Sequence, residues 1–127
     1  MIEKTKASII GSKEIKWRSV CPICSALDVL GDKWTMLIIR DLIQYETRTY
    51  SELLESPENI ATNILSDRLN LLTSLKLIER INPKNPARNN AFKLTESGAA
   101  LRPVLEGFGL WAYKYLKRHN KKMLSLS

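Results

Sequence analysis

Residues 50–95 read YSELLESPENIATNILSDRLNLLTSLKLIERINPKNPARNNAFKLT, and this stretch decides the fold. A short helical segment is followed by a turn that contains Pro57 and Asn59, and then by a longer amphipathic helix. Two short apolar runs come next, and the segment between them is rich in Pro, Asn and basic residues. The expected order is therefore helix, turn, helix and hairpin, with bounds Tyr50–Glu55, Ala61–Leu75, Lys76–Ile81 and Ala91–Leu94. Within the first segment, Ser51 is the expected N-cap of a short helix over Glu52–Glu55.

The helix expected over Ala61–Leu75 has two unlike faces. Leu65, Leu69 and Leu72 recur at helical spacing and would face the core, while Arg68 would pair with a carboxylate of a neighbouring helix. The other face carries small amides and hydroxyls, which both donate and accept hydrogen bonds and so suit base edges and phosphates. The alternative is a weakly charged surface helix. The residues expected to contact DNA from this face are Thr62, Asn63, Ser66, Asp67 and Asn70.

The segment between the two apolar runs is a turn with positive charge. It contains two prolines and several asparagines, which favour a turn over a helix. Lys84, Arg88 and Asn89 are the expected contacts to DNA, and the guanidinium of Arg88 suits anionic oxygens best. The alternative is a hairpin tip with solvated charges. A helix-turn-helix followed by such a hairpin is the layout of a winged helix, whose second helix can enter the major groove.

Helices are expected on both sides of this unit. Pro22 lies in the first turn of a helix that ends at Leu30, and Lys33–Tyr45 forms the next, buried helix. Thr95 is the expected N-cap of a last helix over residues 97–118, which has more apolar surface than a small core needs and therefore suits an interface. The alternative is that the apolar face of this last helix packs against the core of the same chain. The residues expected at a dimer interface are Leu27, Leu101, Leu105, Phe108, Ala112 and Tyr115.

Length and composition fit one basic globular domain. The chain has 127 residues and a net charge of +7, which favours a polyanionic partner. We expect a flexible basic arm over residues 1–19 and a single domain over 20–127, in the α+β class and mostly helical. No apolar run is long enough for a membrane span or a secretory signal, so a cytoplasmic protein is expected.

A set of short motifs occurs in a fixed order along the chain: Cys21-Pro22-Ile23, Ala26-Leu27, Gly31-Asp32-Lys33-Trp34-Thr35, Leu37-Ile38-Ile39-Arg40-Asp41-Leu42, Tyr50-Ser51-Glu52-Leu53, Leu65-Ser66-Asp67-Arg68-Leu69, Leu77-Ile78-Glu79-Arg80 and Leu94-Thr95-Glu96-Ser97-Gly98. Together these motifs resemble the HxlR family of bacterial and archaeal transcription regulators. The resemblance implies a MarR-related winged helix with dimerisation helices at both ends, and homodimers that bind pseudo-palindromic operators. It also implies that Ala61–Leu75 is the recognition helix and that the wing tip is Lys84–Asn90.

The two cysteines suggest a response to oxidants. The resemblance implies this role for Cys21, because some members of the family sense oxidants or electrophiles through a cysteine at that position. A thiol at a helix N-terminus with Arg18 close in sequence would be acidified, and Cys24 would be the resolving thiol. The alternative is a small residue at a dimer interface. The family more often has an acidic residue at the position of Cys24.

Other classes of function fit the sequence less well. Cys21 and Cys24 have the spacing of half a zinc site, but His119 is the only histidine and lies far along the chain. One histidine in a basic tail gives no catalytic triad, so neither an enzyme nor a cofactor or metal site is expected. A winged helix that binds protein instead of DNA is the alternative function. A small-molecule inducer would meet Trp34, Trp111 and Tyr115, although such aromatics more often belong to a core.

Overall fold

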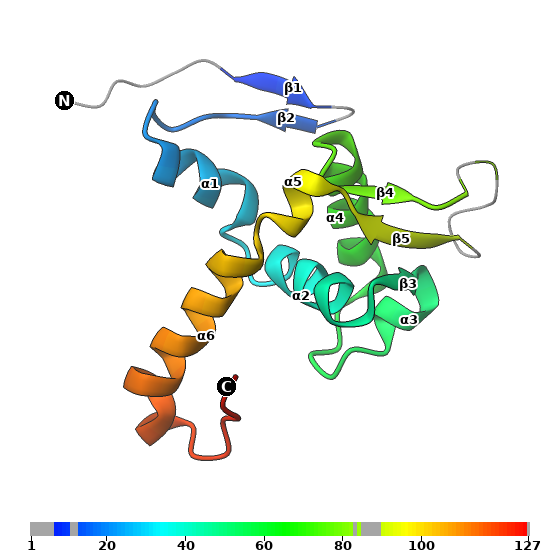
Figure 1. Ribbon diagram of the computed structural model, residues 1–127. Helices are drawn as coiled ribbons and strands as arrows, with labels where there is room; N and C mark the ends of the chain where they lie inside the picture. Colours follow the sequence, from blue (N-terminus) through cyan, green and yellow to red (C-terminus); the bar gives the residue numbers. More distant parts are fainter. Residues whose placement is uncertain (1–6, 11–12, 83, 85–89, 127) are drawn as a thin grey trace.

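The computed structural model describes residues 7–10, 13–82, 84 and 90–126. In Figure 1 the middle of the chain forms a body of helices and a small sheet, and the last long helix runs out from it. The strands are β1 (Ser8–Ile10), β2 (Lys13–Ile15), β3 (Thr47–Thr49), β4 (Ile78–Arg80) and β5 (Ala91–Leu94). The helices are α1 (Pro22–Leu30), α2 (Thr35–Tyr45), α3 (Tyr50–Leu54), α4 (Thr62–Ser74), α5 (Glu96–Ala99), α6 (Arg102–Leu116) and the 3-10 turn η2 (Lys117–His119).

The core lies where α2, α3 and α4 meet the sheet of the wing. Leu65, Leu69 and Leu72 of α4 are buried there, as the helical spacing predicted. Burial of a large aliphatic side chain contributes roughly 1.5–3 kcal/mol, so this cluster dominates the stability of the fold. Its other buried members are Ile38, Ile39, Leu42, Leu53, Ile78 and Phe92. The core therefore holds α4 by its apolar face and leaves its polar face outside.

The wing sheet has three strands, one more than the sequence predicted. The strand order is β3-β5-β4, and all pairs are antiparallel. Phe92 of β5 lies opposite Arg48 on one side and Arg80 on the other. We did not predict β3, because its three polar residues carry no apolar alternation. Together with α3 and α4, this sheet completes the expected winged helix-turn-helix.

Two helix ends differ from the sequence-based expectation. The N-cap of α3 is Thr49, whereas we expected a helix that starts after Ser51. Thr49 and Glu52 form a capping box, in which each side chain accepts from the backbone N–H of the other. Thr95 caps a helix as predicted, but that helix is the short α5, and a turn at Ala100 and Leu101 separates it from α6. The chain thus changes direction before Pro103, while α6 continues without a break through Gly107 and Gly109.

A hairpin lies within the segment that we expected to be a loose arm. β1 and β2 pair with Ser8 opposite Ile15 and Ile10 opposite Lys13. Ile15 is buried, and the indole nitrogen of Trp17 donates a hydrogen bond of 2.9 Å to Ser8 Oγ. Each strand has only three residues, too few for a periodic signal. The expectation for residues 1–6 lies outside the described residues.

Two helices, α1 and α6, contain no buried residue. In Figure 1 they run along the same side of the molecule, away from the wing. α6 is rooted by Leu101 and Leu105, which pack against the core, and most of its length projects beyond it. Among the described residues, no helix has the length and apolar character needed to cross a membrane.

Candidate nucleic-acid interface

α4 presents its predicted contact residues on one outer face. Thr62, Asn63, Ser66 and Asn70 are exposed, and Asp67 is half-buried at the edge of the face. Because the leucines of the opposite face are in the core, this polar face cannot turn inward without loss of the fold. The five residues therefore share one surface, as the helical period predicted.

Tyr50 holds the first turn of α4 against α3, a contact that sequence reasoning missed. Its hydroxyl donates a hydrogen bond of 3.0 Å to the backbone carbonyl of Thr62 and accepts one of 3.3 Å from Ser66 Oγ. One phenol thus links α3 to two successive turns of α4. The sequence shows Tyr50 only as an apolar residue at the start of a helix, so its hydroxyl gave no signal. Ser66 keeps one partner within the protein and still lies on the exposed face.

An ion-pair cluster surrounds Asp67. Arg68 pairs internally, as predicted, but its partners are not on a neighbouring helix. Its Nε donates to Oδ2 of Asp67, on α4 itself, at 3.0 Å, and its Nη1 lies 3.6 Å from Oδ1 of Asp32, between α1 and α2. The ammonium of Lys13, from β2, also pairs with Asp67. The pKa of the Asp67 carboxyl is lowered, chiefly by the hydrogen bond from Lys13 and further by Arg68, against the effect of partial burial. Asp67 is therefore an anion with partners at the edge of the face.

The turn that leads into α4 is fastened to α2. Arg40 of α2 donates two hydrogen bonds of 2.8 Å to Glu58 and also pairs with Asp41 at 2.9 Å. Ser56 donates to the other carboxylate oxygen of Asp41. The pKa of Glu58 is lowered and that of Arg40 is raised, in each case chiefly by the hydrogen bonds between them. This network fixes where α4 begins.

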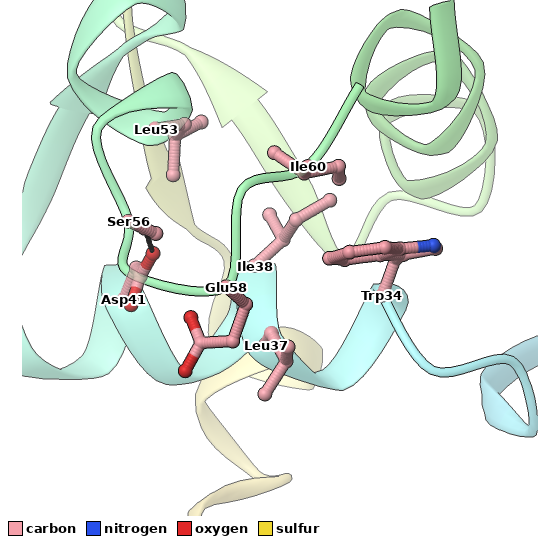
Figure 2. Close-up of a pocket in the computed structure, with 8 residues that line it drawn as sticks. All are labelled: Trp34, Leu37, Ile38, Asp41, Leu53, Ser56, Glu58 and Ile60. Carbon is pink, nitrogen blue, oxygen red and sulfur yellow. Dashed lines mark hydrogen bonds between the residues drawn. The ribbon is translucent and has the colours of Figure 1, made fainter. Parts of the chain in front are cut away.

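A small cavity lies behind the same turn, as Figure 2 shows. Its volume is about 10 Å³, at the lower limit for one water molecule. Trp34 covers one side of it, and Asp41 and Ser56 face each other on the opposite side. The remaining lining residues are Leu37, Ile38, Leu53, Glu58 and Ile60. Trp34 is thus a packing residue of the α2–α4 junction, and this cavity has no room for an organic inducer.

The base of the wing is closed by one buried amide. Asn90 Oδ1 accepts a hydrogen bond of 3.0 Å from the backbone N–H of Asn82, and its amide nitrogen donates to the carbonyl of the same residue. These two hydrogen bonds join Asn82 and Asn90, the two ends of the wing loop. Lys84 is exposed. Arg88 and Asn89 lie outside the described residues, so their contacts with DNA stay predictions.

Both cysteines lie at the start of α1, but the charge beside them differs from the expectation. Cys21 immediately precedes the helix, Cys24 lies in its first turn, and both are free, half-buried thiols. Arg18 pairs with Asp28: its Nε contacts Oδ1, and its backbone N–H donates to Oδ2 at 3.1 Å. This pair raises the pKa of Arg18 and lowers that of Asp28. Arg18, which we expected to be a free positive charge near Cys21, is therefore already paired with the carboxylate of Asp28.

The structure divides the residues that we expected at a dimer interface. Leu27 of α1 and Phe108 and Tyr115 of α6 are exposed, and Ala112 is half-buried. Leu101 and Leu105 instead pack against the core of the chain. We call the exposed apolar side chains of the two helices the α1–α6 surface. It also includes residues that were not predicted: Ile23, Val104, Leu110, Trp111, Tyr113 and Leu116.

Potential metal ligands do not cluster in the described part of the chain: nowhere in it do three His, Cys, Asp or Glu side chains come together to hold an ion. The two thiols therefore have no third partner of that kind among those residues.

Comparison with known proteins finds one family and several named regulators. The HxlR-like helix-turn-helix family matches residues 29–120, a span that includes α2 to α6. The HTH-type transcriptional regulator sll1512 of Synechocystis sp. (strain ATCC 27184 / PCC 6803 / Kazusa) is 34% identical over 87 residues. The HTH-type transcriptional regulator YvaP of Bacillus subtilis (strain 168) is 31% identical over 99 residues. These matches cover 68% and 76% of this chain, and 63% and 90% of the two relatives.

Among solved structures, the reduced form of the transcriptional regulator YodB from B. subtilis is similar over 76% of this chain and 94% of its own. The two chains are 32% identical, with a TM-score of 0.61. The quinone-bound form of YodB covers the same share of this chain, with 30% identity and a TM-score of 0.63. The hairpin of β1 and β2 precedes the residues that the family match includes.

Proposed function

The chain belongs to the HxlR family of helix-turn-helix transcriptional regulators, and from this premise we propose that it binds double-stranded DNA as a homodimer on a pseudo-palindromic operator. The observation that carries the proposal is the outer face of α4, where Thr62, Asn63, Ser66 and Asn70 are exposed beside the wing. Amides and hydroxyls at these positions can reach base edges and phosphates in a major groove.

The homodimer is supported by the α1–α6 surface. Two helices with no buried residue and several exposed aromatic and aliphatic side chains leave an apolar area that a second copy can cover. A two-fold axis through this surface would present two copies of α4 to one face of the duplex. Reading successive major grooves requires them to lie about 34 Å apart, which explains a palindromic site.

Selection of bound duplexes from a random pool tests this proposal. The wild-type protein should enrich a site with two-fold symmetry. Asn63→Ala combined with Asn70→Ala should reduce binding to that site by at least about 1,000-fold, because the dimer loses two base contacts in each copy and each is worth roughly 1–3 kcal/mol. Asn120→Ala is the matched control, since it removes an exposed amide after α6, far from α4 along the chain. Unchanged binding by the double variant would show that α4 does not read the site.

A second, compatible function is release from DNA on thiol oxidation, which the two free cysteines support. Cys21 and Cys24 lie one helical turn apart in a helix of the α1–α6 surface. YodB, solved in reduced and quinone-bound forms, is 30–32% identical to this chain. With diamide, the two thiols would form one S–S bond and transfer two electrons and two protons to the azo group, which becomes a hydrazine. The disulfide would strain the first turn of α1 and so disturb the dimer.

Single serine variants separate the roles of the two thiols. Cys21→Ser should abolish release of DNA by diamide. Cys24→Ser should form no internal disulfide. With glutathione added, diamide should instead join the Cys21 thiol to one glutathione thiol in a mixed disulfide and take up the two electrons and two protons. If both variants release DNA in diamide like the wild type, neither thiol is the sensor.

The alternative of a winged helix that binds only protein predicts a different result. The DNA-binding protein should be retained on immobilised genomic DNA at low salt and elute as salt rises, since release of counterions drives phosphate contacts. A protein-binding module would pass through the column at every ionic strength.

A further inference from the structure

The hairpin of β1 and β2 brings a positive charge to the edge of the polar face of α4. We infer that Lys13 is a positioning residue for DNA recognition: it neutralises Asp67 so that the outer face of α4 can approach the phosphate backbone. The inference rests on the proposed function, and it concerns a segment that precedes the family match at residues 29–120.

The balance of charges around Asp67 carries the argument. Asp67 is the only acidic residue of α4, and it lies at the edge of the face that carries the proposed DNA contacts. Arg68 is shared, because its guanidinium contacts both Asp67 and Asp32. Two carboxylates and one guanidinium leave one uncompensated negative charge. Lys13 removes it, so the four groups together are neutral.

The hairpin places Lys13 at this position by its own packing. Lys13 opens β2 and pairs with Ile10 of β1, and Ile15, two residues on, is buried. The hydrogen bond from Trp17 to Ser8 closes the open end of the hairpin. The side chains of Lys13 and Asp67 remain about one-third exposed, 34% and 35%, so the pair lies where solvent and a bound duplex can reach it.

The neighbouring Lys16 provides a matched control. It lies one residue beyond β2, is exposed, and carries the same charge on the same segment. Loss of either lysine lowers the net charge of the protein by one. Only the loss of Lys13 leaves the carboxylate of Asp67 without its hydrogen bond from an ammonium.

A double-mutant cycle on the full chain tests the inference. The readout is affinity for a duplex that the wild type selects from a random pool, at one fixed ionic strength. Lys13→Ala should weaken binding by about tenfold, the summed effect of one unpaired charge near a phosphate in each copy of the dimer. Lys16→Ala should weaken it by much less. Asp67→Asn should restore the Lys13→Ala variant to within about twofold of Asp67→Asn alone, the limit of additivity, and Lys13→Arg should bind like the wild type.

Each other outcome has a definite meaning. Equal losses from Lys13→Ala and Lys16→Ala would overturn the inference, because net charge alone would explain them. A loss from Lys13→Ala that persists in the Asp67→Asn background would also overturn it, since Lys13 would then contact DNA directly. A wild-type chain that selects no duplex would overturn the proposed function and this inference with it. Thermal unfolding of each variant confirms that the comparison concerns folded protein.

Discussion

Single side chains determine how firmly α4 is placed. Arg40 joins α2 to the turn before α4 through Glu58 and also contacts Asp41, which is buried. The motif containing Arg40 and Asp41 was visible in the sequence, but their partner Glu58 was not. It lies 18 residues along the chain from Arg40, and no local period relates the two. The internal pairing of Arg68 was predictable, because a charged side chain beside an apolar stripe must find a counter-charge.

Replacement of Arg40 tests this anchor. Arg40→Leu should lower the free energy of unfolding by about 2 kcal/mol, since it leaves the buried Asp41 carboxylate with fewer hydrogen-bond donors. The control is Arg102→Leu, at an exposed position on α6. Urea denaturation followed by tryptophan fluorescence measures both variants. Equal stability of the two would show that the Arg40 network is only a surface feature.

The same network makes stability depend on pH. The hydrogen bonds from Arg40 lower the pKa of Glu58 from its ordinary value of 4.5 in the folded state. A lowered folded-state pKa stabilises the protein above the unfolded value, and this contribution is lost as pH falls through the folded value. Between about pH 5 and about pH 3 the wild type should therefore lose more stability than Arg40→Leu, in which this shift is absent. Parallel pH profiles would contradict this account.

Whole elements were predictable in proportion to their length. The amphipathic period gave both ends of α4 within one residue, and β5 has the predicted bounds. The three-residue strands β1, β2 and β3 were missed, because their pairing depends on partner strands and carries no period of its own. The cap of α3 was placed two residues late, although Thr49 and Glu52 have the spacing of a capping box.

The cap of α3 can be verified with two matched hydroxyl deletions. Thr49→Ala removes the side chain that accepts from the backbone N–H of Glu52 and should lower the free energy of unfolding by about 1 kcal/mol. Ser51→Ala removes an exposed hydroxyl of the same helix and should change it by less than about 0.5 kcal/mol. Thermal unfolding followed by circular dichroism distinguishes them, and the reverse order would place the cap at Ser51.

At the scale of the whole molecule, the sequence predicted the apolar stripe of α6. It did not show whether the stripe packs in the core or stays exposed at an interface. A helical period shows that Leu101, Leu105 and Phe108 share a face, yet it cannot tell a core from an interface. The turn at Ala100 and Leu101 decides this, because it sets α6 at an angle that brings only its first residues against the core. In the described residues, the start of α6 therefore packs against the core, while the rest of the helix keeps its apolar side chains exposed.

Negative charges in place of exposed apolar side chains of α6 should dissociate the proposed dimer. Phe108→Glu combined with Trp111→Glu should give a folded monomer by sedimentation equilibrium and weaken DNA binding by more than about tenfold, since a dimer gains affinity from two linked half-sites. Ile9→Glu is the control: it adds one carboxylate, half the charge of the double variant, at an exposed isoleucine on β1. A double variant that sediments as a dimer would show that the two copies associate elsewhere.

The way α6 is rooted has a mechanical consequence for the proposed dimer. Fifteen helical residues span about 22 Å, so a tilt of about 10° at Leu101 and Leu105 moves the far end by about 4 Å. In each copy of the proposed dimer, α4 belongs to the body of the molecule, and α6 projects from that body. The distance between the two copies of α4 therefore depends on the angle between α6 and the body. A change in the packing of Leu101 and Leu105 would alter that distance without moving the exposed side chains of α4 relative to the core of their own chain.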